Sequence, residues 1–211
     1  MTDKNILILS GGLDSVVLLY YLLNKKENIF CLIFDYGQKA KKEIESAKNI
    51  CKELDVEHYV YDVSNMLDIL KFSSLIDEKN SKVKIPADTV IPSRNTIFIE
   101  LATAFAILNN YKKVYYGAIK SSSTDYKDIT PQFLKQINEL NKVNNNKYIP
   151  IEAPFINKEK SEVIKISLEL NVPLEKTWSC YLNGDEPCGE CFSCKSRIEA
   201  IEKVKKELGD V

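Results

Sequence analysis

The chain has 211 residues, of which 45% are apolar and 28% are charged. This length suits a single α/β domain with an appendage, and the apolar fraction is sufficient for a sizeable buried core. The 29 basic and 30 acidic side chains leave a formal net charge of −1, so the chain lacks the basic footprint of proteins that bind the phosphate backbone of nucleic acids.

No apolar run in the sequence reaches the length of a membrane-spanning helix, and the apolar run near the N-terminus is too short for a signal peptide. We therefore expect a cytoplasmic protein without a membrane partner. Cysteines stay reduced in the cytoplasm, where clustered cysteines usually bind metal.

The first predicted strand, Ile6–Leu9, ends in the loop SGGLDS (residues 10–15), and an apolar helix is predicted from Val16 to Leu23. The two loop glycines can adopt positive φ, so backbone N–H groups can approach an anion closely. We expect Asp14 or Ser15 to cap the helix, whose N-terminal dipole also favours anions. The loop lacks the lysine of a Walker A motif, which suits an enzyme that holds pyrophosphate while the α-phosphate is attacked. An ordinary strand-to-helix turn is the alternative.

Strands and helices alternate along the rest of the chain. Short runs rich in β-formers predict four further strands, at Ile29–Phe34, Glu57–Val63, Lys113–Tyr116 and Tyr148–Ile151. Apolar runs, most of them at helical spacing, predict helices at Lys41–Leu54, Thr96–Leu108, Pro131–Asn141, Lys158–Leu170 and Lys195–Leu208. Right-handed crossovers between such strands predict an α/β fold with a doubly wound, mostly parallel five-stranded sheet.

Polar residues follow the second strand and precede the central helix, at the sheet edge where ligands of open α/β folds collect. Asp35, Tyr36 and Gln38 come directly after the second strand, and we expect them to contact a nucleotide. A plain glycine-containing turn is the alternative. Arg94 and Asn95 stand at the start of the central helix, where a capping asparagine and a surface arginine are the alternative to a role in the site.

The polar segment after the fourth strand combines two carboxylates with an aromatic ring, at Asp125, Tyr126 and Asp128. Such a segment is a candidate contact zone for a small molecule, although serine-rich loops of this kind are common. The chain's only histidine, His58, lies in a predicted strand. A lone histidine in a strand is usually structural, so we assign it no catalytic role.

Four cysteines near the C-terminus form a C-x7-C-x2-C-x2-C pattern, with thiols at Cys180, Cys188, Cys191 and Cys194. The two x2 spacings bring thiolates around one ion, and four sulfur ligands favour a structural zinc with no open coordination position. Disulfides are the alternative, but they fit poorly in a reducing compartment. An iron–sulfur cluster is the chemical competitor, since it also takes four cysteine thiolates.

Four motifs stand in one order along the chain: SGGLDS, FDYGQ, IPSRN, and TWSCY followed by PCGECFSC. The first by itself resembles the PP-loop of the ATP-pyrophosphatase superfamily. Together the four resemble the 7-cyano-7-deazaguanine synthase (QueC) family over essentially the whole chain. The resemblance implies an adenine nucleotide alpha hydrolase-like PP-loop domain over residues 1–176, and a four-cysteine zinc-binding hook with a C-terminal helix over residues 177–211.

The resemblance also implies an ATP-dependent carbon–nitrogen ligase. It would convert 7-carboxy-7-deazaguanine and ammonia to 7-cyano-7-deazaguanine, the precursor of queuosine or archaeosine, through adenylated intermediates. Both adenylations need a site that excludes solvent and neutralises phosphate charge. ATP, Mg²⁺ and structural Zn²⁺ are the implied cofactors, and a homodimer is the implied assembly.

By position, the resemblance distributes the site residues over four groups. Catalysis would fall to Asp14, Ser15 and Arg94. Nucleotide binding would fall to Ser10, Gly11, Gly12, Leu13, Asp14, Ser15, Asp35, Tyr36, Gln38, Arg94 and Asn95. Substrate binding would fall to Asp125, Tyr126, Asp128, Thr177, Trp178 and Tyr181. The metal would be held by Cys180, Cys188, Cys191 and Cys194.

Three places depart from the family pattern: Lys39-Ala40, Ser93 and, with the largest consequence, residues 126–130. Residues 126–130 read YKDIT, without the proline and arginine that the family has there. Arginine is the natural bidentate partner of a substrate carboxylate, so the identity of the substrate depends on this segment.

Three other functions remain open at this point. A QueC-like paralogue would adenylate a deazaguanine for conjugation to another acceptor, such as a protein in a defence or modification system. A tRNA-modifying PP-loop enzyme would share the loop, but the near-neutral charge argues against a nucleic-acid partner. A non-enzymatic ATP-binding module would show no turnover.

Overall fold

A five-stranded parallel sheet forms the centre of the protein, which we describe from a computed structural model covering residues 3–65, 90–120, 126–182 and 184–209. The strand order is β3-β2-β1-β4-β5, and each neighbouring pair is parallel, which confirms the predicted fold class. The strands are β1 (Lys4–Ile8), β2 (Asn28–Asp35), β3 (His58–Asp62), β4 (Val114–Tyr116) and β5 (Ile151–Glu152).

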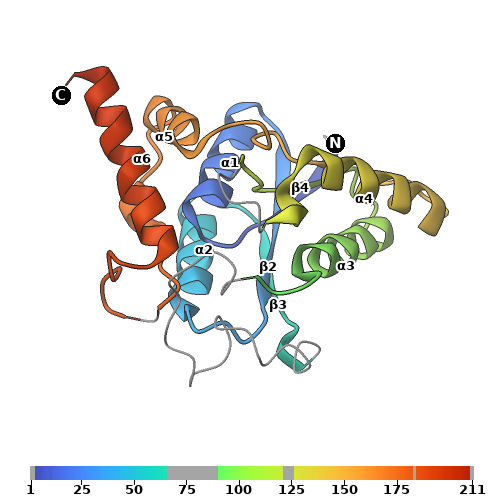
Figure 1. Ribbon diagram of the computed structural model, residues 1–211. Helices are drawn as coiled ribbons and strands as arrows, with labels where there is room; N and C mark the ends of the chain where they lie inside the picture. Colours follow the sequence, from blue (N-terminus) through green and yellow to red (C-terminus); the bar gives the residue numbers. More distant parts are fainter. Residues whose placement is uncertain (1–2, 66–89, 121–125, 183, 210–211) are drawn as a thin grey trace.

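The helices cover both faces of the sheet (Figure 1), because successive strand residues point to opposite faces. Leu7 of β1 packs with α1, α2, α5 and α6 on one face, and Ile6 packs with α3 and α4 on the other. The helices are α1 (Leu13–Asn24), α2 (Lys41–Glu53), α3 (Arg94–Leu108), α4 (Pro131–Asn144), α5 (Lys160–Glu169) and α6 (Phe192–Leu208). In the described part of the chain, no helix combines the length and apolarity needed to cross a bilayer.

Two element boundaries differ from the predicted ones for local reasons. The fifth strand begins at Ile151 rather than Tyr148, because Pro150 has no N–H to donate to a ladder. The last helix begins at Phe192 rather than Lys195. Its N-cap is Cys191, whose sulfur accepts a hydrogen bond from the backbone N–H of Cys194.

The loop SGGLDS turns from β1 into α1 by a different route from the predicted one. Helix α1 begins at Leu13 with Gly12 as its N-cap and without a side-chain cap. The expectation that Asp14 or Ser15 caps the helix is therefore wrong, since both lie in its first turn. Gly12 has φ −72°, and Gly11 alone in the loop adopts positive φ, at 85°.

Gly11 is the point where the loop touches helix α2. A Cβ atom built on Gly11 would lie 2.0 Å from the backbone oxygen of Glu43 and 2.9 Å from the backbone nitrogen of Ala47. A side chain is therefore excluded both by the conformation and by the neighbouring helix. The loop is held directly against the first turns of α2.

Replacing Gly11 by alanine tests this packing. We expect Gly11→Ala to lower the free energy of unfolding by about 3 kcal/mol or more, because left-handed backbone costs L-residues and the new methyl group collides with helix α2. Gly37→Ala is the control. Gly37 also has positive φ, at 80°, but its Cβ would meet only Ser64 Cβ, at 3.8 Å, so about 1–2 kcal/mol is expected. Equal losses in urea unfolding would show that α2 moves aside for the methyl group.

Candidate functional site

A cavity of about 320 Å³ opens where β1, β2 and β4 end. The strand order reverses between β1 and β4, and open α/β sheets bind ligands in the crevice at such a point. The cavity is lined by the loop after β1, the starts of α2 and α3, one residue of α5 and part of the C-terminal segment. The segments singled out in the sequence thus meet at one place.

Most of the predicted site residues line this cavity, namely Ser10, Gly12, Leu13, Asp14, Ser15, Tyr36, Gln38, Arg94, Asn95, Tyr126 and Tyr181. The cavity lining does not include Gly11, Asp35, Asp128, Thr177 or Trp178. Asp125 lies outside the described residues. Sequence reasoning missed several lining residues, of which Glu43, Tyr116, Lys160, Ser179 and Ser193 are polar.

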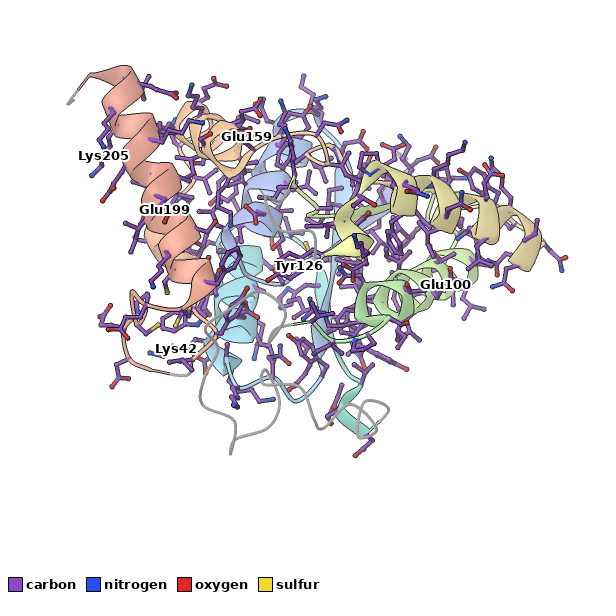
Figure 2. The ribbon with its side chains drawn as sticks, viewed as in Figure 1. Lys42, Glu100, Tyr126, Glu159, Glu199 and Lys205 are labelled. Atoms are coloured by element: carbon purple, nitrogen blue, oxygen red, sulfur yellow. The ribbon has the colours of Figure 1, made fainter. Side chains whose placement is uncertain are left out.

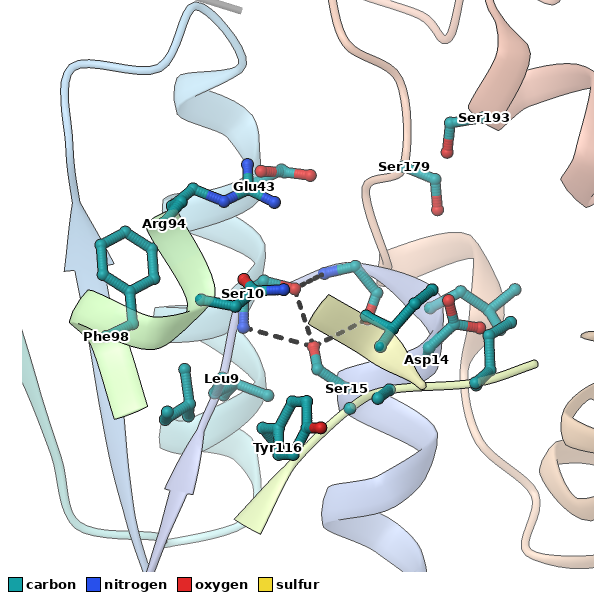
Figure 3. A pocket seen from close by; sticks show the side chains of 18 of the residues that line it. Leu9, Ser10, Asp14, Ser15, Glu43, Arg94, Phe98, Tyr116, Ser179 and Ser193 are labelled. Carbon is teal, nitrogen blue, oxygen red and sulfur yellow. Dashed lines mark hydrogen bonds between the residues drawn. The ribbon is translucent and has the colours of Figure 1, made fainter. Parts of the chain in front are cut away.

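Hydroxyl groups hold the loop open toward the cavity (Figure 3). The Oγ atoms of Ser10 and Ser15 lie 3.0 Å apart, and the Ser15 hydroxyl donates to the backbone oxygen of Gly12. The first helical hydrogen bond of α1 runs from the Val16 N–H to Gly12. The N–H groups of residues 13–15 therefore precede the helical ladder. They are placed to bind an anion at the positive end of the helix.

Lys160 supplies the cation that the loop itself lacks. Its Nζ lies 3.3 Å from Asp14 Oδ2, and the side chains of Lys160 and Asp14 are only 18% and 24% exposed. Lys160 is the first residue of α5, where a cation opposes the helix dipole. In the sequence, this unfavourable position is the signal that could have identified Lys160 as a site residue. The other carboxylate oxygen of Asp14 is buried and has no hydrogen-bond partner among the described residues.

Arg94 and Glu43 face each other across the cavity from α3 and α2 (Figure 3). The guanidinium donates to the Tyr36 hydroxyl at 3.3 Å, and its carbon lies 5.5 Å from the centre of that ring. Burial raises the pKa of Glu43 to about 8 even though the charge of Arg94 opposes this. In the sequence, Glu43 resembles any acidic residue in the first turn of a surface helix.

Tyr116, the last residue of β4, presents a phenol to the cavity wall. Its residue is 6% exposed, and its hydroxyl has no hydrogen-bond partner among the described residues. Burial and then the charge of Asp128 raise the pKa of Tyr116, so the phenol stays protonated and can donate. Asp128 lies in the short helix η3 (Lys127–Ile129), close enough to interact with Arg94 as well.

Two residues at and just after the end of β2 support the turn that follows it, namely Asp35 and Gln38. The Gln38 side chain accepts from the Tyr36 N–H and donates to the backbone oxygen of Phe34. Asp35 accepts from the Gly37 N–H and pairs with Lys41 at 2.7 Å. Asp35 thus stabilises the turn, and the buried amide of Gln38 both stabilises the turn and lines the cavity.

The segment before the first cysteine is fastened to the loop, and of its residues 177–179 only Ser179 lines the cavity. The backbone N–H of Trp178 donates to the Gly11 oxygen at 3.0 Å. The Ser46 hydroxyl lies between that oxygen, at 3.1 Å, and the Lys176 oxygen, at 2.6 Å. Lys42 sits over the Trp178 ring, 5.0 Å from its centre, beside the cysteine segment (Figure 2). Trp178 thus holds the loop from outside the cavity.

The cysteine segment, which we call the hook (residues 177–194), brings its four sulfur atoms together. The sulfurs of Cys180, Cys188, Cys191 and Cys194 all lie within 4.8 Å of one another. Backbone N–H groups donate to three of them at 3.3–3.4 Å. Burial alone would raise the pKa of Cys188, but backbone hydrogen bonds from Cys191 and Glu190 lower it to about 7. The set fits a metal ion.

Comparisons of sequence assign the chain a family. Residues 4–205 match the family model described as queuosine biosynthesis protein QueC. The chain is 35% identical to 7-cyano-7-deazaguanine synthase 1 of Colwellia psychrerythraea over 208 residues, covering 96% of this chain and 95% of that protein. It is 37% identical to 7-cyano-7-deazaguanine synthase of Archaeoglobus fulgidus over 205 residues, covering 94% and 85% respectively.

Solved structures share the fold at low sequence identity. The U34-tRNA thiolase NcsA of Methanococcus maripaludis, solved with its [4Fe-4S] cluster, has a TM-score of 0.56 and 18% identity, and the match covers 98% of this chain and 67% of that one. The NMN synthetase of Francisella tularensis has a TM-score of 0.54 and 16% identity, covering 97% and 83%. These likenesses establish the PP-loop architecture alone.

Arg197 of α6 fixes the hook from behind, which can be tested by substitution. Its guanidinium donates to the Leu174 oxygen, to the Thr177 oxygen and hydroxyl, and to the Ser179 hydroxyl. We expect Arg197→Met to lower the free energy of unfolding by about 2–4 kcal/mol, because several buried acceptors lose a charged donor. Arg197→Lys should recover only part of the loss, since an ammonium cannot span these acceptors.

Lys195→Met is the matched control, because Lys195 is exposed on the same helix. It should change the free energy of unfolding by no more than about 0.5 kcal/mol. If urea unfolding shows that Arg197→Met changes the free energy of unfolding no more than Lys195→Met does, the hook does not depend on this arginine.

Proposed function

We propose, from the premise that the chain belongs to the QueC family of queuosine biosynthesis proteins, that it converts 7-carboxy-7-deazaguanine and ammonia to 7-cyano-7-deazaguanine with ATP. The observation that carries the proposal is the loop SGGLDS, which opens into the cavity at the switch point of the sheet. The names of the relatives supply the product, 7-cyano-7-deazaguanine, and the acid and ammonia are the substrates that the resemblance to the family implies.

The loop and Lys160 form a pocket for pyrophosphate. Backbone N–H groups at the start of α1 bind its oxygens, and Lys160 offsets the negative charge that develops as pyrophosphate leaves the α-phosphate. The unpartnered Oδ1 atom of Asp14 is the kind of ligand that Mg²⁺ takes. A bound Mg²⁺ would neutralise phosphate charge at this place. Ser15 keeps the loop in shape through its bonds to Ser10 and Gly12.

The reaction needs two activations because neither a carboxylate nor an amide oxygen leaves readily. A carboxylate oxygen of the substrate attacks the α-phosphate of ATP, an O–P bond forms, and pyrophosphate leaves. Ammonia displaces AMP to give an amide. The amide oxygen then attacks a second ATP in the same way, and loss of AMP and of both nitrogen-bound protons gives the nitrile. A cavity that excludes water keeps both adenylates from hydrolysis.

Arg94 is suited to orient the acid in the cavity. A guanidinium binds a carboxylate through two parallel hydrogen bonds, and Arg94 is the arginine among the residues that line the cavity. It takes the role of the arginine that residues 126–130 lack. Tyr126, Tyr181 and the phenol of Tyr116 line the remaining wall, where aromatic rings can hold a planar heterocycle.

The hook holds a structural zinc. A tetrahedral zinc with Zn–S bonds of about 2.3 Å separates its sulfurs by roughly 3.8 Å, and the Sγ atoms of Cys188 and Cys194 lie 4.0 Å apart. A four-iron cluster is larger and holds its thiolates farther apart. All four ligands come from one segment, so no coordination position is left for a substrate. The metal acts by keeping the hook on the loop.

The proposal predicts a defined product. The wild-type protein incubated with 7-carboxy-7-deazaguanine, ammonium, ATP and Mg²⁺ should give the nitrile by mass spectrometry, with AMP and pyrophosphate released in both activations. We expect Lys160→Met to lower kcat/KM for ATP by about 10–100-fold, since one charge-assisted contact to phosphate is lost. Lys158→Met is the control, because Lys158 does not line the cavity. AMP and pyrophosphate without nitrile would point to another acceptor.

The metal is tested by its identity. We expect the purified protein to be colourless, with one zinc per chain by elemental analysis, and Cys191→Ser to lose most of it because three thiolates bind less tightly than four. Cys51→Ser should keep its zinc, since Cys51 is buried in α2 away from the cluster. A brown protein that contains iron would show that the four cysteines hold an iron–sulfur cluster and not zinc.

A further inference from the structure

Glu43 is a cavity-lining carboxylate to which the proposed function gives no role. It lies in the first turn of α2, directly beneath the loop, because its backbone oxygen is the atom that excludes a Cβ from Gly11. Its side chain lines the same cavity as Ser10 and Asp14. It stands opposite Arg94 (Figure 3). Glu43 is therefore next to the position where the α-phosphate and the acid must meet.

The second cavity-lining carboxylate is already engaged. Among the described residues that line the cavity, the carboxylates are Asp14 and Glu43. Asp14 pairs with Lys160 at 3.3 Å and faces the pyrophosphate pocket. Tyr116 stays protonated because burial raises its pKa, so it donates rather than accepts a proton. Glu43 remains as the proton acceptor on the side of Arg94.

The groups that face Glu43 determine when it can accept a proton. Arg94 of α3 lies opposite, with Tyr36 of the turn after β2 beside it. Behind Arg94 stand Asp128 of η3 and Tyr181 of the hook. Burial outweighs the favourable charge of Arg94 and raises the pKa of Glu43 to about 8. A base with a pKa near the working pH is effective in general catalysis.

Converting ammonia to the nitrile removes three protons from nitrogen: one as the amide forms, one as the adenylated amide becomes a neutral imidate, and one as the nitrile forms. When ammonia displaces AMP from the acyl-adenylate, a C–N bond forms, the C–O bond breaks, and the attacking nitrogen must lose a proton. In the last step the adenylated amide, as its neutral imidate, loses its N–H proton. That electron pair becomes the third C–N bond, and the C–O pair leaves with AMP. The first and the last of these proton losses need a proton acceptor within the cavity.

We propose that Glu43 is this acceptor: its carboxylate takes the proton from ammonia as the amide forms and the imidate N–H proton as the nitrile forms. The inference rests on the proposed function. Arg94 orients the acid so that its carbon lies beside Glu43, and the proton passes to water between the two steps. Adenylation of the acid transfers no proton to Glu43; adenylation of the amide gives a protonated imidate, which loses one proton to water before the last step.

Separating adenylation from the later steps tests the proposal. Glu43→Gln keeps the size of the side chain but cannot accept a proton, and Glu43→Asp keeps the carboxylate. Exchange of labelled pyrophosphate into ATP with the acid and no ammonium reports adenylation alone. Nitrile formation from 7-amido-7-deazaguanine reports the second adenylation together with the last step. We expect Glu43→Gln to keep exchange within about threefold of wild type and to lower nitrile formation by about 10²–10⁴-fold, with partial recovery in Glu43→Asp.

The pH dependence gives a second readout that a structural role would not affect. In the wild type the rate of nitrile formation should rise with pH toward about 8 as Glu43 loses its proton, and Glu43→Gln should lose this rise. Glu45→Gln is the control, because Glu45 is exposed on the same helix. It should match the wild type in both assays.

Each outcome either supports or overturns the proposed role of Glu43. Nitrile formation by Glu43→Gln within threefold of wild type overturns the proposal, and so does an equal loss of exchange and nitrile formation, which would make Glu43 a nucleotide-binding residue. If the wild type adenylates the acid and forms amide but no nitrile, the proposed function fails. The role of Glu43 is then tested by comparing the rate of amide formation with ammonium in the wild type and in Glu43→Gln. A wild type without exchange activity overturns both.

Discussion

The backbone of Gly11 is the constraint on which the site depends. Its α-carbon lies against the first turns of α2 so closely that no side chain fits, and its oxygen receives the N–H of Trp178 from the C-terminal segment. One residue therefore joins the loop, the second helix and the hook. The direction of the free N–H groups at the start of α1 follows from these contacts.

Cationic groups are brought to the site from distant parts of the chain instead of from the loop. Lys160 comes from the start of α5 and Arg94 from the start of α3. Both positions oppose the local helix dipole, so neither is favoured by its own helix. The parallel sheet compensates, because the carboxyl ends of its strands share one edge and the helices that follow begin there. A net charge near zero is thus compatible with two cationic side chains at one site.

Much of the fold could be predicted from the sequence because it rests on local patterns. Continuous apolar runs such as Ile29–Phe34 can be buried only as central strands, and strand–helix alternation leaves few topologies. The meeting of the loop with Tyr36 and Arg94 followed from the shared sheet edge. The zinc-like spacing of the cysteines was equally local. These are the features that the structure and the family relationship confirm at the level of fold and family.

The parts that could not be predicted depend on contacts between distant segments. Glu43 and Lys160 look like ordinary polar residues on surface helices, since nothing local distinguishes the one turn that faces the cavity. Trp178 was expected in the pocket wall, yet its backbone serves the loop. The cap of α1 was misjudged because the Ser15 hydroxyl bonds back to Gly12. The loop takes the conformation of this hydrogen bond only when α2 and the hook hold it in place.

The hydroxyl of Ser46 links two backbone oxygens, one at residue 11 and one at residue 176, across 35 and 130 positions of the chain. Contacts of such wide separation form late, because their loops are costly to close. During translation the first strand and helix leave the ribosome long before the hook is made. A nascent chain would therefore carry an unsupported loop, and competence to bind nucleotide would arrive only once the hook is made.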